Sequence, residues 1–278
     1  MPDVSTYRDV VQSTSPGEGG QLRVLTFASP ALGGRGEVTL FVPAGVPPGT
    51  PLAVLLTGVY GSHWAWAAQG SAHRTAGRLI DDGRIRPMVL AMPVDGLWSG
   101  DTGYVRHEHG DYERWIMQDV VGCVHEVVPE LGPELLLAGL SIGGYGALRL
   151  GAKHGEQVRA VSAHSPITRL HDMARFIQEP NTYLAEEPFV GVWIARHRAR
   201  LPRLRFDCGT ADPLLDASRR LHEELDRQRI DHVYEEFPGA HDWTYWAAHL
   251  QDTLLFFEAC LKDAAAPAGP REPRRYEG

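Results

Sequence analysis

The sequence predicts a single α/β domain, built on a mostly parallel sheet with helices on both of its faces. Three observations carry this prediction. Short apolar runs rich in β-branched residues alternate with longer segments of helical periodicity, which is the pattern of a helix-covered parallel sheet. The length of 278 residues fits one large domain. An apolar content of 43% with 22% charged residues is that of an ordinary globular chain rather than a disordered one.

The predicted strands begin with a hairpin pair and continue as buried runs. Segments 22–27 and 38–42 are expected to pair with each other early in the sheet. Later runs are interpreted as mostly buried strands, as a parallel sheet requires. These runs are 52–56, 88–92, 134–138, 160–164, 204–208 and 232–237.

Helices are predicted in the gaps between these strands. Segment 111–128 places Trp115, Ile116 and Val120 at helical spacing, and Asp111 is a suitable residue to cap its first turn. Similar periodicity predicts helices over 143–154, 216–229 and 243–261.

Two segments depart from this alternation. Segment 169–203 is longer than a simple crossover and is a candidate cap over the edge of the sheet. The tail 264–278 is rich in Ala, Pro and Arg without apolar periodicity, so we expect it to be disordered. The predicted folded domain is therefore 1–263.

Charge and cysteine content exclude several classes of protein. With 27 basic and 35 acidic side chains the net charge is −8, which disfavours a nucleic-acid partner. No stretch approaches the roughly 20 apolar residues of a membrane span, and the first residues do not have the pattern of a secretion signal. Three cysteines without paired spacing indicate reduced thiols. We therefore expect a cytoplasmic protein with no membrane association.

The motif that carries chemistry is a serine on a glycine-rich turn. Ser141 directly follows the predicted strand 134–138 and precedes a predicted helix, which is the setting of a nucleophile elbow. So tight a turn brings the residues two before and two after the serine together, and Gly139 and Gly143 occupy those positions. The turn presents the serine hydroxyl outward and directs the Ile142 N–H toward a developing oxyanion.

A serine nucleophile needs a base and an acid, which follow in the expected order Ser, Asp, His. Asp212 and His241 each lie in a loop directly after a predicted strand, at the edge where α/β active sites gather. The competing interpretations are that Asp212 only caps a helix or turn and that His241 is a polar residue at a helix start. Asp207, within a predicted strand, and Asp216, in a predicted helix, are lesser candidates for the acid.

The remaining parts of the site are expected in neighbouring loops. The N–H of Val59, after strand 52–56, is the expected second oxyanion donor beside that of Ile142. Aromatic residues in the loops after two strands suit an apolar acyl or aryl group, although packing in the core or in an interface explains any one of them equally well. The candidate pocket residues are Tyr60, Trp64, Trp66 and Trp98.

Together these residues resemble the Putative esterase family. The resemblance covers 22–261 and rests on the elbow 139–147, the turn 55–58, the helix start 112–115 and the segment 239–246. The family includes S-formylglutathione hydrolases, tributyrin, feruloyl and acetyl-xylan esterases and the antigen 85 mycolyltransferases. The resemblance implies an α/β-hydrolase fold, ester hydrolysis without a cofactor or metal, and frequent homo-oligomers. One departure is Thr57, where many relatives carry His or Asp, so hydrogen bonding by that side chain is in doubt.

We therefore expect a serine esterase that acts through an acyl-enzyme on a small acyl or aryl ester. The alternatives are an acyltransferase of the antigen 85 type and a catalytically silent binding protein on the same fold. Two further patterns carry less weight. In the string His107, Glu108 and His109, the two histidines at alternate positions have no third ligand at a suitable spacing, so no metal is assigned. The run 196–200 is interpreted as a solvated basic helix face.

Overall fold

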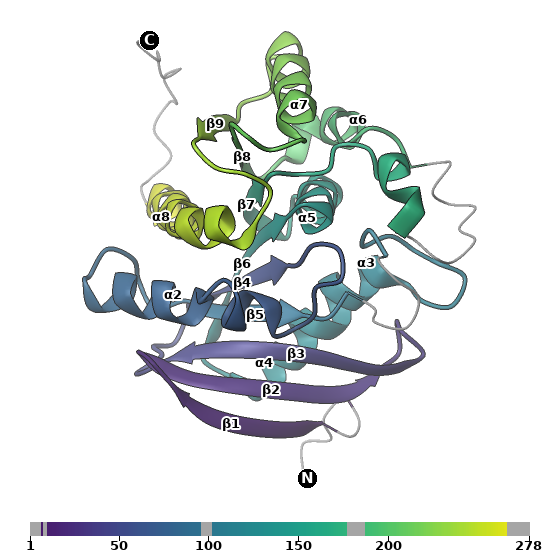
Figure 1. Cartoon of the computed structure of the whole chain (residues 1–278). Helices are drawn as coiled ribbons and strands as arrows, with labels where there is room; N and C mark the ends of the chain where they lie inside the picture. Colours follow the sequence, from purple (N-terminus) through teal and green to yellow (C-terminus); the bar gives the residue numbers. More distant parts are fainter. Residues whose placement is uncertain (1–6, 8–9, 96–101, 177–186, 266–278) are drawn as a thin grey trace.

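A nine-stranded sheet forms the centre of the protein in a computed structural model, which describes residues 7, 10–95, 102–176 and 187–265 (Figure 1). The strand order is β1-β2-β3-β5-β4-β6-β7-β8-β9. The pairs β1/β2, β2/β3 and β3/β5 are antiparallel. The remaining pairs in this order, from β5/β4 to β8/β9, are parallel. The strands are β1 (Val11–Gly17), β2 (Gly20–Ser29), β3 (Gly34–Pro43), β4 (Thr50–Leu56), β5 (Val89–Pro93), β6 (Leu131–Leu140), β7 (Val158–His164), β8 (Arg203–Gly209) and β9 (Val233–Phe237).

All eight predicted strands are confirmed, and one strand was not predicted. The expected early hairpin is β2 with β3, in a register that places Leu25 opposite Val38. The unpredicted strand is β1, whose residues are almost all exposed at the edge of the sheet. It is held by its antiparallel backbone pairing with β2. A strand with no buried face has no period-two apolar pattern, so the sequence carried no signal for it.

Helices cover both faces of the sheet and enclose two separate cores. Figure 1 shows α2 and α8 on one face and α5 and α6 on the other. The first core joins α1, α2 and α8 to the sheet, and the second joins α4 to α7 to it. The helices are α1 (Ala65–Ala68), α2 (Ala72–Asp81), α3 (Tyr112–Arg114), α4 (Val121–Val127), α5 (Ile142–Lys153), α6 (Val190–Arg196), α7 (Leu215–Arg227) and α8 (Trp243–Ala265).

The predicted helix 111–128 is interrupted. It consists of α3, a π-helical turn Trp115–Val120 and α4. Asp111 caps it as expected, since its carboxylate accepts the Arg114 N–H at 2.9 Å. The other three predicted helices match α5, α7 and α8, and the sequence analysis did not anticipate α1, α2 or α6. Of these, α1 and α6 have only four and seven residues, so their periodicity extends over few turns.

The two irregular segments are described only in part. Segment 169–203 contains a 3₁₀ helix, Leu170–Phe176, and α6, while 177–186 lie outside the described residues. Of the tail 264–278, only the backbone of the end of α8 is described, so the expected disorder of 266–278 concerns residues outside the described ranges. None of the helices in the described part of the chain combines the length and apolar character that crossing a bilayer requires.

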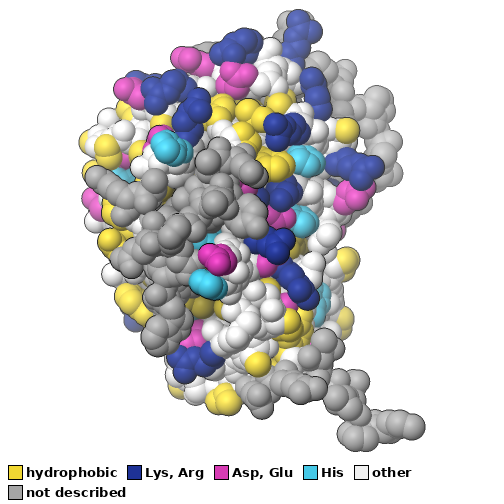
Figure 2. Space-filling model, turned by 90° about the vertical axis from the view of Figure 1, so that its right-hand side faces the viewer, with side chains coloured by type: hydrophobic (Ala, Val, Ile, Leu, Met, Phe, Trp, Pro, Cys, Tyr) yellow, Lys and Arg dark blue, Asp and Glu magenta, His cyan; other side chains and the backbone are white. Residues whose placement is uncertain are grey.

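An ion-pair network joins α3 to the helix that follows Ser141. Glu113 on α3 accepts hydrogen bonds from Arg149 and Lys153, both at 2.7 Å, and lies 2.9 Å from His154. The buried Arg149 also pairs with Glu187 at 2.6 Å. Figure 2 shows basic, acidic and histidine side chains gathered on the face of the molecule that bears α3 and α6. This network fixes the outer face of α5 against α3.

We expect Glu113→Gln to lower the free energy of unfolding at pH 7 by about 2 kcal/mol, the scale of hydrogen bonds to charged groups. Burial would raise the pKa of Glu113, but His154, Arg149 and Lys153 hold that pKa well below its ordinary value of 4.5. The stabilisation is therefore complete above about pH 4.5 and is lost as the pH falls through the folded-state value. Urea unfolding from pH 7 to pH 3 measures the difference, which should shrink at low pH.

The matched control is Glu156→Gln, since Glu156 pairs with Arg200 where both side chains are 68% exposed. Surface pairs contribute little, so this variant should unfold like the unmodified protein. Equal stabilities for Glu113→Gln and Glu156→Gln would contradict the assigned role of Glu113.

Candidate active site

Ser141 lies on a strained turn between β6 and α5. Its φ of 54° and ψ of −119° are unfavourable for a residue with a side chain. A Cβ on Gly139 would lie 2.1 Å from the Gly143 oxygen, and one on Gly143 would lie 2.4 Å from the Thr57 oxygen. Only glycine fits at either position: the approach of the two flanking residues explains Gly139, as the sequence pattern suggested, and the backbone at the end of β4 explains Gly143.

The structure brings Ser141, His241 and Asp212 into one hydrogen-bonded chain. His241 Nε2 lies 3.0 Å from Ser141 Oγ, and His241 Nδ1 lies 2.8 Å from Asp212 Oδ2. A carboxylate only accepts, so Nδ1 carries the proton and Nε2 is left to accept from the serine hydroxyl. The three residues follow β6, β9 and β8, whose carboxyl ends meet at one edge of the sheet.

Asp212 is buried and held at both oxygens. Oδ2 faces His241, and Oδ1 accepts the Leu214 N–H at 2.8 Å. The turn-capping role and the pairing with histidine, which the sequence left as alternatives, are thus both present. Burial alone would raise the pKa of Asp212, but hydrogen bonds from His241 and Ser165 hold the pKa below its ordinary value. The carboxyl group is therefore ionised at neutral pH.

The lesser acid candidates lie elsewhere. Asp207 is fully buried within β8, where it contacts His164 at 2.9 Å and accepts a hydrogen bond from Tyr245 at 2.8 Å. Burial would raise the pKa of Asp207, but His164 and the nearby Arg205 lower it to about 2. Asp216 is exposed in the first turn of α7. Asp207 thus belongs to a buried polar network beneath the site, separate from the pair of Asp212 with His241.

A cavity of about 480 Å³ opens over Ser141 and His241. Its walls are mainly apolar and aromatic, which suits an acyl or aryl group. Several of these walls come from segments that the sequence analysis did not assign to the site, because nothing in a local pattern marks a residue that faces a cavity made by distant segments. The unpredicted lining residues include Ile167, Met173, Phe176, Leu214 and Gln69.

The predicted pocket residues have three different outcomes. Tyr60 and Trp64 line the cavity and remain exposed, by 74% and 46%. Trp66 does not line it: the side chain is 1% exposed in the core, where its indole N–H donates to the Leu56 carbonyl at 3.0 Å. Its contact with the site is indirect, through an edge-to-face packing against Trp243 at 5.4 Å. Trp98 lies outside the described residues.

The turn after β4 is held by a tyrosine that the sequence analysis missed. The Tyr104 hydroxyl donates to the Thr57 carbonyl and accepts the Thr57 N–H, both at 3.0 Å. The Thr57 hydroxyl itself is buried without a hydrogen-bond partner among the described residues. The doubt about that side chain was therefore justified, and Tyr104 holds the backbone of the turn instead.

The two predicted oxyanion donors belong to the turn after β4 and to the start of α5. Val59 lines it, and Ile142 is the first residue of α5, where an N–H has no partner within the helix. Neither N–H donates in the backbone hydrogen bonds found in the described turns and loops. The role of both groups as oxyanion donors stays a prediction.

The string 107–109 does not form a cluster of ligands. His107 is buried, and its Nε2 lies 2.8 Å from the Thr102 carbonyl oxygen. Within the described ranges, the three-residue group with metal-ligand geometry is a different one, His222, Asp226 and His232.

The strand order and the strand–serine–helix turn define the class of protein as an α/β-hydrolase, confirming the predicted fold. The family model described as "Putative esterase" matches residues 29–257. The chain belongs to this family, as the sequence resemblance indicated.

Individual relatives are more distant. An acetyl esterase of Caldicellulosiruptor saccharolyticus is 27% identical over an alignment of 147 residues, and the match covers 46% of this chain and 55% of that protein. The match thus spans about half the length of this curated relative. A ferulic acid esterase structure has a TM-score of 0.76 at 20% identity, covering 88% of this chain and all of its own. An S-formylglutathione hydrolase of Agrobacterium tumefaciens has a TM-score of 0.74 at 17% identity, covering 91% and 99%.

Proposed function

We propose that the protein hydrolyses carboxylic esters through an acyl-enzyme on Ser141. The observation that carries the proposal is the hydrogen-bonded chain of Ser141, His241 and Asp212 at a cavity with apolar walls. Membership in the esterase family supports the same reaction class.

The reaction proceeds in two half-reactions. His241 Nε2 takes the proton of Ser141 as the hydroxyl attacks the ester carbonyl, and then gives it to the departing alcohol. Asp212 keeps the imidazole in the required tautomer and stabilises its charged form. The N–H groups of Val59 and Ile142 stabilise the tetrahedral oxyanion. Water then attacks the acyl-enzyme by the same route, which releases the acid and restores Ser141.

The substrate we propose is a small acyl or aryl ester. The cavity of about 480 Å³ is walled by Tyr60, Trp64, Phe176 and Trp243, and aromatic walls suit an apolar group with few polar anchors. An acyltransferase differs only in the nucleophile that attacks the acyl-enzyme. A competing alcohol distinguishes the two, because a transferase then forms the new ester at the expense of free acid.

The experiment is hydrolysis of p-nitrophenyl acetate, butyrate and octanoate, together with labelling by a fluorophosphonate probe. We expect saturable hydrolysis, with a chain-length preference that reports the size of the acyl pocket, and labelling of Ser141. A protein that neither hydrolyses any of these esters nor reacts with the probe is a silent binding protein, and the proposal is then wrong.

A further inference from the structure

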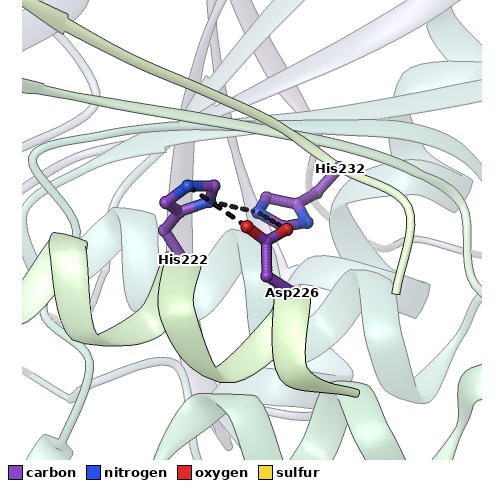
Figure 3. A group of neighbouring side chains, drawn as sticks. All are labelled: His222, Asp226 and His232. Atoms are coloured by element: carbon purple, nitrogen blue, oxygen red, sulfur yellow. Dashed lines mark hydrogen bonds and ion pairs between the residues drawn. The ribbon is translucent and has the colours of Figure 1, made fainter. Parts of the chain in front are cut away.

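His222, Asp226 and His232 converge at the end of α7 that is remote from Asp212 (Figure 3). His222 and Asp226 are one turn apart on the same side of the helix, and His232 lies just before β9. One ligand atom from each side chain lies within 4.8 Å of the other two. This group has no part in the proposed reaction.

His232 is fixed in a form that leaves one nitrogen free to bind. Its side chain is 2% exposed and stacks on Phe206 at 5.6 Å with an interplanar angle of 10°. Its Nδ1 lies 2.8 Å from the Ile230 carbonyl oxygen, so Nδ1 carries the proton. The lone pair of Nε2 therefore points at His222. Metal-binding histidines are oriented in the same way, by a second N–H that donates to a backbone carbonyl.

His222 supplies the opposite nitrogen. Its ring stacks on Tyr234 at 4.8 Å, and its Nδ1 lies 2.8 Å from His232 Nε2. Because His232 Nε2 can only accept, the proton between the two rings belongs to His222. Two ligands on a tetrahedral zinc ion are about 3.3 Å apart, so the rings need to separate by about 0.5 Å and to turn until both lone pairs meet at the ion.

Asp226 completes the set from the open side. Its Oδ2 lies 3.4 Å from His222 Nε2, and its Oδ1 lies 4.0 Å from His232 Nε2. When a cation takes the place of the proton on His222 Nδ1, that proton moves to Nε2. The Asp226 side chain then turns away from Nε2 so that one of its oxygens binds the cation, a movement that its exposed position allows. The Asp226 side chain is 63% exposed, which leaves the fourth position open to water.

We propose that His222, Asp226 and His232 bind a zinc ion that joins α7 to the start of β9. Two imidazoles and one carboxylate are ligands that borderline divalent cations prefer, whereas Ca²⁺ and Mg²⁺ prefer oxygen ligands alone. Asp212 precedes α7, and His241 follows β9. The ion therefore joins the last turn of α7 to the start of β9, at the ends of these elements that are remote from Asp212 and His241. Its role is structural, and it stabilises the folded state by its binding free energy.

The test is titration of chelator-treated full-length protein with Zn²⁺ by calorimetry, and in parallel with Ca²⁺. We expect one equivalent of Zn²⁺ to bind with no binding of Ca²⁺. His222→Gln should weaken Zn²⁺ binding by at least about 10- to 100-fold, the range known for the loss of groups that only orient ligands. The control is His249→Gln, because His249 is also paired with a carboxylate, Asp252, at 2.8 Å but has no second histidine.

A second variant and a second readout guard against misfolding. Asp226→Asn changes an exposed side chain and should also weaken Zn²⁺ binding. Zn²⁺ should raise the Tm of the unmodified protein and of His249→Gln but not of His222→Gln, with p-nitrophenyl acetate hydrolysis unchanged. The proposal is wrong if no Zn²⁺ binds, or if His222→Gln and Asp226→Asn bind it as the unmodified protein does.

Discussion

Ser141→Ala is expected to lower kcat for p-nitrophenyl acetate by about 10⁶, the cost of removing a triad serine in a hydrolase. Alanine lacks the hydroxyl of Ser141, so no acyl-enzyme forms, and His241 has no proton to take. Residual activity should remain above that of water because the oxyanion donors and the cavity are unchanged. The measurement is initial rates with saturating ester for both proteins, together with loss of fluorophosphonate labelling.

Ser15→Ala is the control, since Ser15 is exposed on β1 at the far edge of the sheet. It should hydrolyse and label like the unmodified protein. The Ser141→Ala protein should also unfold at an unchanged Tm. Equal rates for Ser141→Ala and Ser15→Ala would show that Ser141 is not the nucleophile.

The parts of the site that the sequence predicted are those with a local cause. Gly139 is imposed by a backbone contact with Gly143 inside the turn itself, so the glycine spacing indicates the turn, although Gly143 is also constrained by the end of β4. Asp212 and His241 each follow a strand within a few residues, and parallel strands bring such loops to one edge. The meeting of these loops at one edge of the sheet could therefore be anticipated without knowing any contact between distant residues.

What the sequence did not reveal depends on contacts between distant segments. Tyr104 holds the Thr57 turn from 47 positions away, and Phe176 reaches the cavity from an irregular segment. Trp64 and Trp66 are both tryptophans in the same segment after β4, yet Trp66 lies in the core and Trp64 is exposed. His222 lies on α7 and His232 just before β9, and their approach is set by the packing of α7 on the sheet. Periodicity specifies which face of an element is buried but not which partner it meets.

Asp212→Asn is expected to lower kcat by about 10⁴ with little change in KM. An asparagine amide can donate to His241 Nδ1, which favours the tautomer whose Nε2 carries a proton and cannot accept from Ser141. The loss is smaller than that of Ser141 because the nucleophile and the oxyanion donors remain. Steady-state kinetics on p-nitrophenyl acetate measures both constants.

Two further asparagine variants distinguish this role from a general effect of losing a carboxylate. Asp252→Asn removes a partner of His249 at the same 2.8 Å distance, at a half-buried position on α8, and should retain full kcat. Asp207→Asn breaks the buried contacts with His164 and Arg205, so its free energy of unfolding should fall by about 3 to 5 kcal/mol. Its folded fraction should keep a far higher kcat than Asp212→Asn. If Asp207→Asn instead lost the larger part of kcat while folded, the acid would be Asp207, and the pairing of Asp212 with His241 would serve only to position the loop.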